Sequence, residues 1–119
     1  MRRLAVKLAW KFINTPYRWK DADNSGFVKI LLSGMALISK KTELTAHTLA
    51  FSFPLVQTPK AGCLAFWLSP NGQIYERVEF CLDDELSIGA FDNYINVHPT
   101  RSPHRIVDPF KLKPYHWEN

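Results

Sequence analysis

Residues 16–27 read PYRWKDADNSGF and decide the fold, because they lead from a turn into a strongly apolar segment. From Phe27 to Met35 the apolar residues cover most of a helix circumference, which is typical of a helix buried in a core. Asp23, Asn24 and Ser25 are all good N-caps, so this helix is expected to begin at or near Asn24. Gly34 is expected to end it.

A first helix is expected before this stretch, over residues 3–13. Its apolar stripe is formed by Leu4, Ala5, Leu8, Ala9, Phe12 and Ile13, with Arg3, Lys7 and Lys11 on the other side. Pro16 disfavours helical geometry in the residue before it and so ends this helix. A third, short helix is expected between Thr42 and Phe51.

From residue 62 onward the pattern changes to short β-branched and aromatic runs, at 63–68, 73–82, 85–91 and 94–98. Turn signals at 69–72 and 83–85 separate them, which predicts an antiparallel sheet built from hairpins. Residues 98–105 are expected to form a loop that contains His98 and His104, and 106–110 a last extended segment. Helices first and strands second indicate an α+β fold, with the second helix packed on the sheet.

The length of 119 residues fits a single domain over 1–119, with 110–119 as a loosely ordered tail. Lys7 and Lys11 interrupt the apolar N-terminus, so cytoplasmic synthesis without a signal peptide is expected. No segment is long and apolar enough to insert in a membrane. The net charge of +4 comes without a dense basic run, which favours a solvated surface over nucleic-acid binding.

The two cysteines, Cys63 and Cys81, both lie in apolar runs and are expected to be buried thiols. Their spacing fits no zinc pattern. A metal site built on His98 and His104 would lack further ligands. Neither a metal nor another cofactor is therefore expected.

Four segments, in this order, resemble motifs of the NlpC-like cell-wall peptidases, which are small papain-like cysteine peptidases that cut peptidoglycan stem peptides. The segments are FINTPYRW (12–19), DNSGFV (23–28), KAGCLAFW (60–67) and ERVEFCLDDELSIGA (76–90). The resemblance runs from about residue 4 to residue 110. It implies a papain-like NlpC-type fold, in which the helix that carries the nucleophile packs on the sheet. The short chain and the VDPF near its end look most like members encoded in phage tail-assembly regions.

The resemblance also implies where catalytic groups would lie. In the family a cysteine begins the buried helix, whose N-terminus favours the thiolate. A histidine on the facing strand acts as base, and a third polar residue orients it. In this sequence the three positions hold Asn24, Arg77 and Gly89. An amide is no nucleophile, a guanidinium stays protonated and glycine has no side chain, so no catalytic residue is intact.

Other residues could in principle restore activity, but none has a supporting arrangement. Ser25 lies about 100° further round the helix than Asn24. Cys63 stands where the family usually has Asp, and Cys81 either shares the face of Arg77 or is displaced by a bulge. His47, His98 and His104 have no nucleophile placed beside them. The loops after residues 19 and 90 are short, which indicates trimmed cleft walls.

These observations favour an inactive NlpC-like domain that acts as a structural or binding module, with tail or assembly proteins as partners and a place in a virion tail. In that reading Asp23 could pair with Arg77. Two alternatives stay open. Tyr17, Asp23 and Ser25 keep identities that help bind substrate in the family, so peptidoglycan stem peptides could still be bound. A residual hydrolase with unusual catalytic groups is the other.

Overall fold

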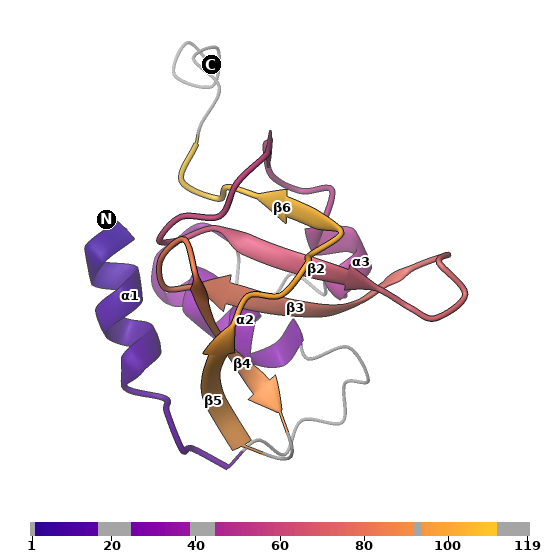
Figure 1. Cartoon of the computed structure of the whole chain (residues 1–119). Coiled ribbons are helices and arrows are strands. Elements are labelled where there is room, and N and C mark those ends of the chain that lie inside the picture. The colour runs from indigo at the N-terminus through magenta and orange to yellow at the C-terminus, as the bar shows by residue number, and fades with distance from the viewer. Residues whose placement is uncertain (1, 17–24, 39–44, 92–93, 112–119) are drawn as a thin grey trace, which may run out of the picture.

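The computed structural model describes residues 2–16, 25–38, 45–91 and 94–111. In them, helices α1 (Arg2–Trp10), α2 (Ser25–Gly34) and α3 (Ala46–Leu49) accompany a single six-stranded sheet. The strands are β1 (Leu55–Val56), β2 (Leu64–Leu68), β3 (Tyr75–Cys81), β4 (Leu86–Phe91), β5 (Tyr94–Pro99) and β6 (Arg105–Val107). Every pairing is antiparallel, in the order β1-β6-β2-β3-β4-β5. The predicted α+β architecture, with N-terminal helices on an antiparallel sheet, is confirmed (Figure 1).

Helix α2 is the buried helix that the opening stretch predicted. It begins at Ser25 and ends at Gly34, as expected, whereas Asn24 lies outside the described residues. Phe27, Val28, Leu31 and Leu32 are each at most 1% exposed and belong to the main hydrophobic core. Removing these side chains from water supplies much of the free energy that holds α2 against β3 and β4.

Helix α1 is shorter than the pattern predicted, since it ends at Trp10 and turns carry the chain on to Asn14. Asn14 has a φ of 63°, a left-handed conformation that Asn tolerates, and Pro16 then forms an isolated bridge to Tyr94. The expected stripe was partly wrong. Ala5 and Ala9 are buried, but Leu4 and Ile13 are exposed, and the helix therefore approaches the core along its small residues.

Helix α3 lies inside the expected range but is only four residues long. Thr45 caps it reciprocally: the Thr48 N–H donates to the Thr45 hydroxyl, and the Thr45 N–H donates to the Thr48 hydroxyl. Strand β1 was not predicted, because two residues are too few to show an alternating pattern. Of the expected tail, 112–119 lie outside the described residues.

A partly buried ion pair joins the two ends of the described chain. Arg2 donates to both carboxylate oxygens of Asp108, at 2.8 and 2.6 Å, and the Phe110 N–H donates to the same carboxylate. Burial alone would raise the pKa of Asp108, but the hydrogen bonds from Arg2 and Phe110 and the charges of Arg2 and Lys60 outweigh it and lower that pKa. This contact fixes α1 against the segment that follows β6.

The sheet has two faces with different contents. Along β3, Val78 and Phe80 enter the core beneath α2, so Arg77, Glu79 and Cys81 point to the opposite side. We call this side the outer face. Pairing of β2 with β3 is regular from Leu64–Phe80 to Trp67–Arg77, so no bulge separates Cys81 from Arg77. Cys81 thus shares the face of Arg77, and it packs in a small second cluster with Cys63, Ala65 and Ile106.

Candidate functional site

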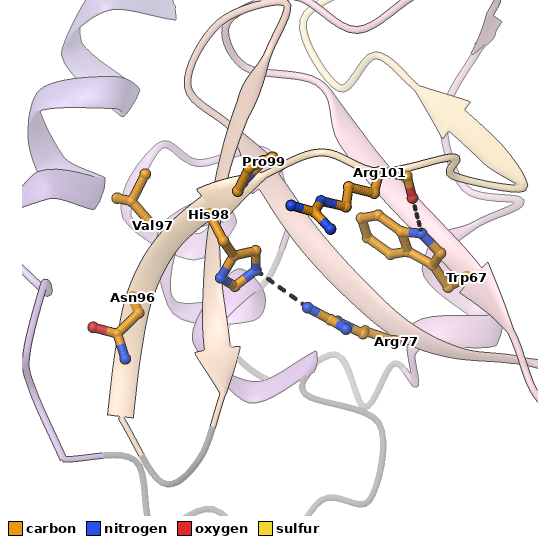
Figure 2. A pocket seen from close by; sticks show the side chains of 7 residues that line it. All are labelled: Trp67, Arg77, Asn96, Val97, His98, Pro99 and Arg101. Carbon is orange, nitrogen blue, oxygen red and sulfur yellow. Dashed lines mark hydrogen bonds between the residues drawn. The ribbon is translucent and has the colours of Figure 1, made fainter.

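A buried carboxylate organises the polar part of the outer face. Glu79 is fully buried, and Arg77 donates to its Oε2 through Nε at 2.8 Å and through Nη2. The Nε2 of His98 on β5 lies 2.5 Å from the same oxygen. It also lies 3.1 Å from Nη2 of Arg77, the contact drawn as a dashed line in Figure 2. The Ser87 hydroxyl on β4 donates to the other oxygen, Oε1, at 2.6 Å. We call Arg77, Glu79, Ser87 and His98 the Glu79 cluster.

The hydrogen bonds in this cluster keep Glu79 ionised. Burial alone would raise the pKa of Glu79, but the hydrogen bonds from His98 and Ser87 and the charge on Arg77 outweigh it and lower the pKa. An ionised carboxylate can only accept, so the proton on Nε2 of His98 points to Glu79. The buried negative charge is thus matched by a guanidinium that is itself only 33% exposed.

Gly89 on β4 provides the space that Glu79 occupies. A Cβ atom at position 89 would lie 2.7 Å from Cγ and 3.3 Å from Cδ of Glu79. Real Cβ atoms essentially never make contacts that short, and Glu79 is held at its far end by three partners. A side chain at position 89 and this placement of Glu79 therefore exclude each other.

A pocket of about 430 Å³ opens beside the cluster, and Figure 2 shows the side chains around it. Its lining consists of Trp67, Arg77, Asn96, Val97, His98, Pro99 and Arg101. The Arg77 guanidinium lies 5.2 Å from the centre of the Trp67 ring, and the indole N–H of Trp67 donates to the Arg101 carbonyl at 2.7 Å. Both contacts hold the aromatic wall of the pocket in place.

The cluster superficially resembles a serine–histidine–glutamate set, but its geometry does not activate a nucleophile. Ser87 and His98 are paired across β4 and β5. The Ser87 hydroxyl, however, donates its hydrogen bond to Glu79, and Ser87 is fully buried. A nucleophile needs a base within hydrogen-bond reach and access to substrate. Ser87 therefore anchors the carboxylate.

The cysteines are also poorly suited to catalysis. Cys63 and Cys81 are unpaired thiols and both fully buried. Burial raises the pKa of each, which disfavours the reactive thiolate. Across the described part of the chain, no three His, Cys, Asp or Glu side chains lie close enough together to hold a metal ion. None of the helices in that part is long and apolar enough to cross a membrane.

The structure brings some predicted site residues together. Arg77 and Gly89 both lie against Glu79, from neighbouring strands of the sheet. Ser25 begins α2 and is buried. Tyr17, Asp23 and Asn24 lie outside the described residues, so the expected pairing of Asp23 with Arg77 stays a prediction.

His98 was expected both at the end of the run 94–98 and at the start of a loop, and its placement in the loop was wrong. His98 lies on β5 and belongs to the Glu79 cluster, because the strand extends to Pro99. His104 does precede β6 in a loop, where its Nδ1 accepts from the Leu68 N–H. His47 is on α3, and its Nδ1 accepts from the Tyr75 N–H.

Glu79 and Ser87 were not recognised from the sequence. Glu79 stands between Val78 and Phe80 in an otherwise apolar run, and a charged residue in such a run is rarely buried unless it is paired. That interruption was the available signal. Arg77 lies two residues away on the same strand, but Ser87 and His98 come from β4 and β5, and only the strand pairing brings them to Glu79.

No protein-family model and no curated protein matches the sequence. Solved structures do match. One is the NlpC/p60 domain of the peptidoglycan hydrolase SagA, at 23% identity over 91% of this chain and 98% of that chain, with a TM-score of 0.72. Another is a protein of the NLP/P60 family, similar to lipoprotein, from Staphylococcus aureus subsp. aureus Mu50, at 17% identity, 93% coverage of this chain and a TM-score of 0.74.

A third is an NlpC/p60 family protein from Bacillus cereus ATCC 10987, at 14% identity over 93% of this chain, with a TM-score of 0.78. This chain spans 42% of the length of the Staphylococcus protein and 41% of that of the Bacillus protein. At these identities the likeness is one of fold. The chain has the α+β fold of NlpC/p60 domains.

Proposed function

We propose that this NlpC/p60-like domain is catalytically inactive and serves as a structural or binding module. The observation that carries the proposal is the Glu79 cluster. Arg77, at the position where the resemblance places the catalytic base, is a permanently protonated guanidinium bonded to a buried carboxylate. A group in that state cannot accept a proton from a nucleophile.

The contact between Gly89 and Glu79 supports the same proposal. The resemblance places the residue that orients the base at position 89. Any side chain there would clash with Glu79. Arg77, Glu79 and Gly89 therefore form a mutually dependent set. A histidine at position 77 would remove the guanidinium that pairs with the buried Glu79 carboxylate, and a histidine at position 89 would clash with Glu79.

As a module, the domain would act through contacts with other proteins. The resemblance to members encoded in phage tail-assembly regions leads us to propose tail or assembly proteins as those partners. The test is co-purification of the domain with the proteins of its assembly after reversible crosslinking. Recovery of the monomeric domain alone from an intact assembly would contradict this part of the proposal.

The absence of catalysis is tested directly. The purified protein is incubated with peptidoglycan and with a γ-D-glutamyl-diaminopimelate peptide, beside the NlpC/p60 domain of SagA as the positive control, and the products are separated by chromatography. We expect products from the control only. Turnover by this protein that disappears in an Asn24→Ala, His98→Ala or Cys81→Ala variant would overturn the proposal.

The fold that this chain shares with a peptidoglycan hydrolase domain favours a second candidate, the binding of peptidoglycan stem peptides without cleavage. A pull-down on purified sacculi tests it, with an unrelated protein of similar basic charge as control. Retention above that control, lost in a Tyr17→Ala/Asp23→Ala double variant, would favour this candidate over a role confined to protein partners.

A further inference from the structure

The pocket beside the Glu79 cluster has the size of a small-molecule site. Its volume of about 430 Å³ falls within the roughly 300–1,000 Å³ that is usual for ligand pockets. The Trp67 ring and Pro99 supply apolar surface, and Arg77, Arg101 and His98 supply polar groups. The Val97 side chain packs against the main core instead. An apolar wall with a few convergent polar groups is the usual composition of a binding site.

The charge of the lining is positive. Among the described residues that line the pocket, two are arginines and none is Asp or Glu. The negative charge of Glu79 offsets the positive charge of Arg77. Glu79 itself is fully buried, and its oxygens already accept hydrogen bonds from Arg77, His98 and Ser87. Arg101 is exposed, and no described acidic residue forms an ion pair with it, so the pocket presents this guanidinium to an arriving ligand.

The wall of the pocket and the Arg101 backbone are held in position before a ligand arrives. Arg77 is fixed between the Trp67 ring and the Glu79 carboxylate, and the Arg101 backbone is fixed by the indole N–H of Trp67. Figure 2 shows these side chains and His98 arranged around the same space. Groups that are already ordered lose less entropy on binding, which favours affinity for a small ligand.

We propose that this pocket binds a small organic oxyanion, a carboxylate or a phosphate ester. The oxyanion accepts hydrogen bonds from Arg101 at the rim, and the apolar part of the ligand lies against the Trp67 ring. Guanidinium groups suit this role because their planar donors match the geometry of carboxylate and phosphate oxygens. The inference rests on the proposed function, since it names the ligand class of the binding module.

The experiment uses phenylacetate, phenyl phosphate and the uncharged phenylacetamide as probes. Binding to the ¹⁵N-labelled protein is followed through the indole N–H resonance of Trp67, which a Trp67→Phe variant identifies among the four tryptophans. We expect the two anions to shift this resonance saturably and the amide to leave it unchanged. The relative affinities of the two anions then separate a carboxylate site from a phosphate site.

Arg101→Gln is the informative variant, and Arg3→Gln is its matched control because it removes the same charge from an exposed arginine on α1. Loss of a charged hydrogen bond should weaken anion binding by about tenfold or more in Arg101→Gln only. The proposal is overturned if neither anion shifts the resonance at millimolar concentration, if the amide binds equally well, or if both variants weaken binding alike.

These outcomes are independent of the test for catalysis. If no anion binds and no turnover is seen, the proposed ligand is rejected and the proposed inactive module stands. If turnover is seen and the anions bind, the proposed inactive module is rejected and the proposed anion site stands.

Discussion

Glu79 and Gly89 share one space on the outer face of the sheet: a Cβ on Gly89 would lie 2.7 Å from Cγ of Glu79. Glu79 reaches Arg77, His98 and Ser87 from that position, so the absence of a side chain at residue 89 is a condition for the cluster. This relationship explains why the position that the resemblance assigns to a polar side chain holds a glycine.

Gly89→Ala should lower the free energy of unfolding by about 1–3 kcal/mol, the usual cost of overpacking, because Glu79 is anchored and cannot move aside. Urea unfolding followed by fluorescence measures it. Gly34→Ala is the control, since its Cβ would meet only Leu8 Cδ2 at 3.4 Å, and it should be neutral or stabilising. If the clash is the cause, Gly89→Ala should cost less in a Glu79→Ala background than in the native protein.

Glu79→Gln should lower the free energy of unfolding by about 2–3 kcal/mol, because the amide keeps the shape of the side chain but removes the buried negative charge that pairs with Arg77. We place the cost below that of a fully buried pair, since Arg77 and His98 are 33% and 23% exposed and can be partly hydrated. Glu76→Gln, an exposed change on the same strand, should stay within about 0.5 kcal/mol. Equal effects of the two changes would refute the structural role of the cluster.

Acid should destabilise the protein through Glu79 and Asp108. The pKa of Glu79 is lower in the folded protein than its ordinary value of 4.5, and the pKa of Asp108 is lower than its ordinary value of 3.8. At acidic pH the unfolded chain therefore binds more protons at these two groups than the folded protein does. The contribution of both groups is present above their ordinary values and is lost as the pH falls through the folded values. Thermal unfolding between pH 6 and pH 2.5 should show this loss, and Glu79→Gln should make the curve shallower. An unchanged slope would contradict the lowered pKa of Glu79.

Arg2→Gln should lower the free energy of unfolding by about 2–3 kcal/mol, because it leaves the fully buried Asp108 carboxylate with weaker compensation. The cation that remains is Lys60, whose Nζ lies 3.7 Å from Oδ2 of Asp108 and whose side chain is largely exposed. Arg3→Gln, the adjacent and exposed arginine, should have an effect near zero. Hydrogen exchange would show the Arg2→Gln loss first in α1, which this contact fastens to the segment after β6.

Cys63 and Cys81 should resist a thiol reagent in the folded protein, since both are fully buried and burial raises the pKa of each thiol. We expect no labelling by a chromogenic disulfide reagent within minutes at neutral pH, and two labelled thiols after addition of urea. Rapid labelling of one cysteine in the native protein would revive the alternative of a hydrolase with unusual catalytic groups.

Local patterns predicted much of the fold. The apolar run after Ser25 predicted α2, Gly34 predicted its end, and the short β-branched and aromatic runs after residue 62 predicted most of the sheet. These features depend on neighbours within one turn or one strand, which a sequence displays directly. The exposed side of α1 was harder to predict, because whether Leu4 or Ala5 enters the core depends on how closely the helix approaches it.

By itself, then, the sequence determined the element types and the buried helix. Only the tertiary structure decided which side chains surround Arg77 and Gly89. Arg77, Glu79, Ser87, Gly89 and His98 come from three strands, and their contacts depend on the register of β3, β4 and β5. A register is set by the packing of the whole sheet, so the buried charge cluster and the pocket beside it could not be predicted from any single stretch of the chain.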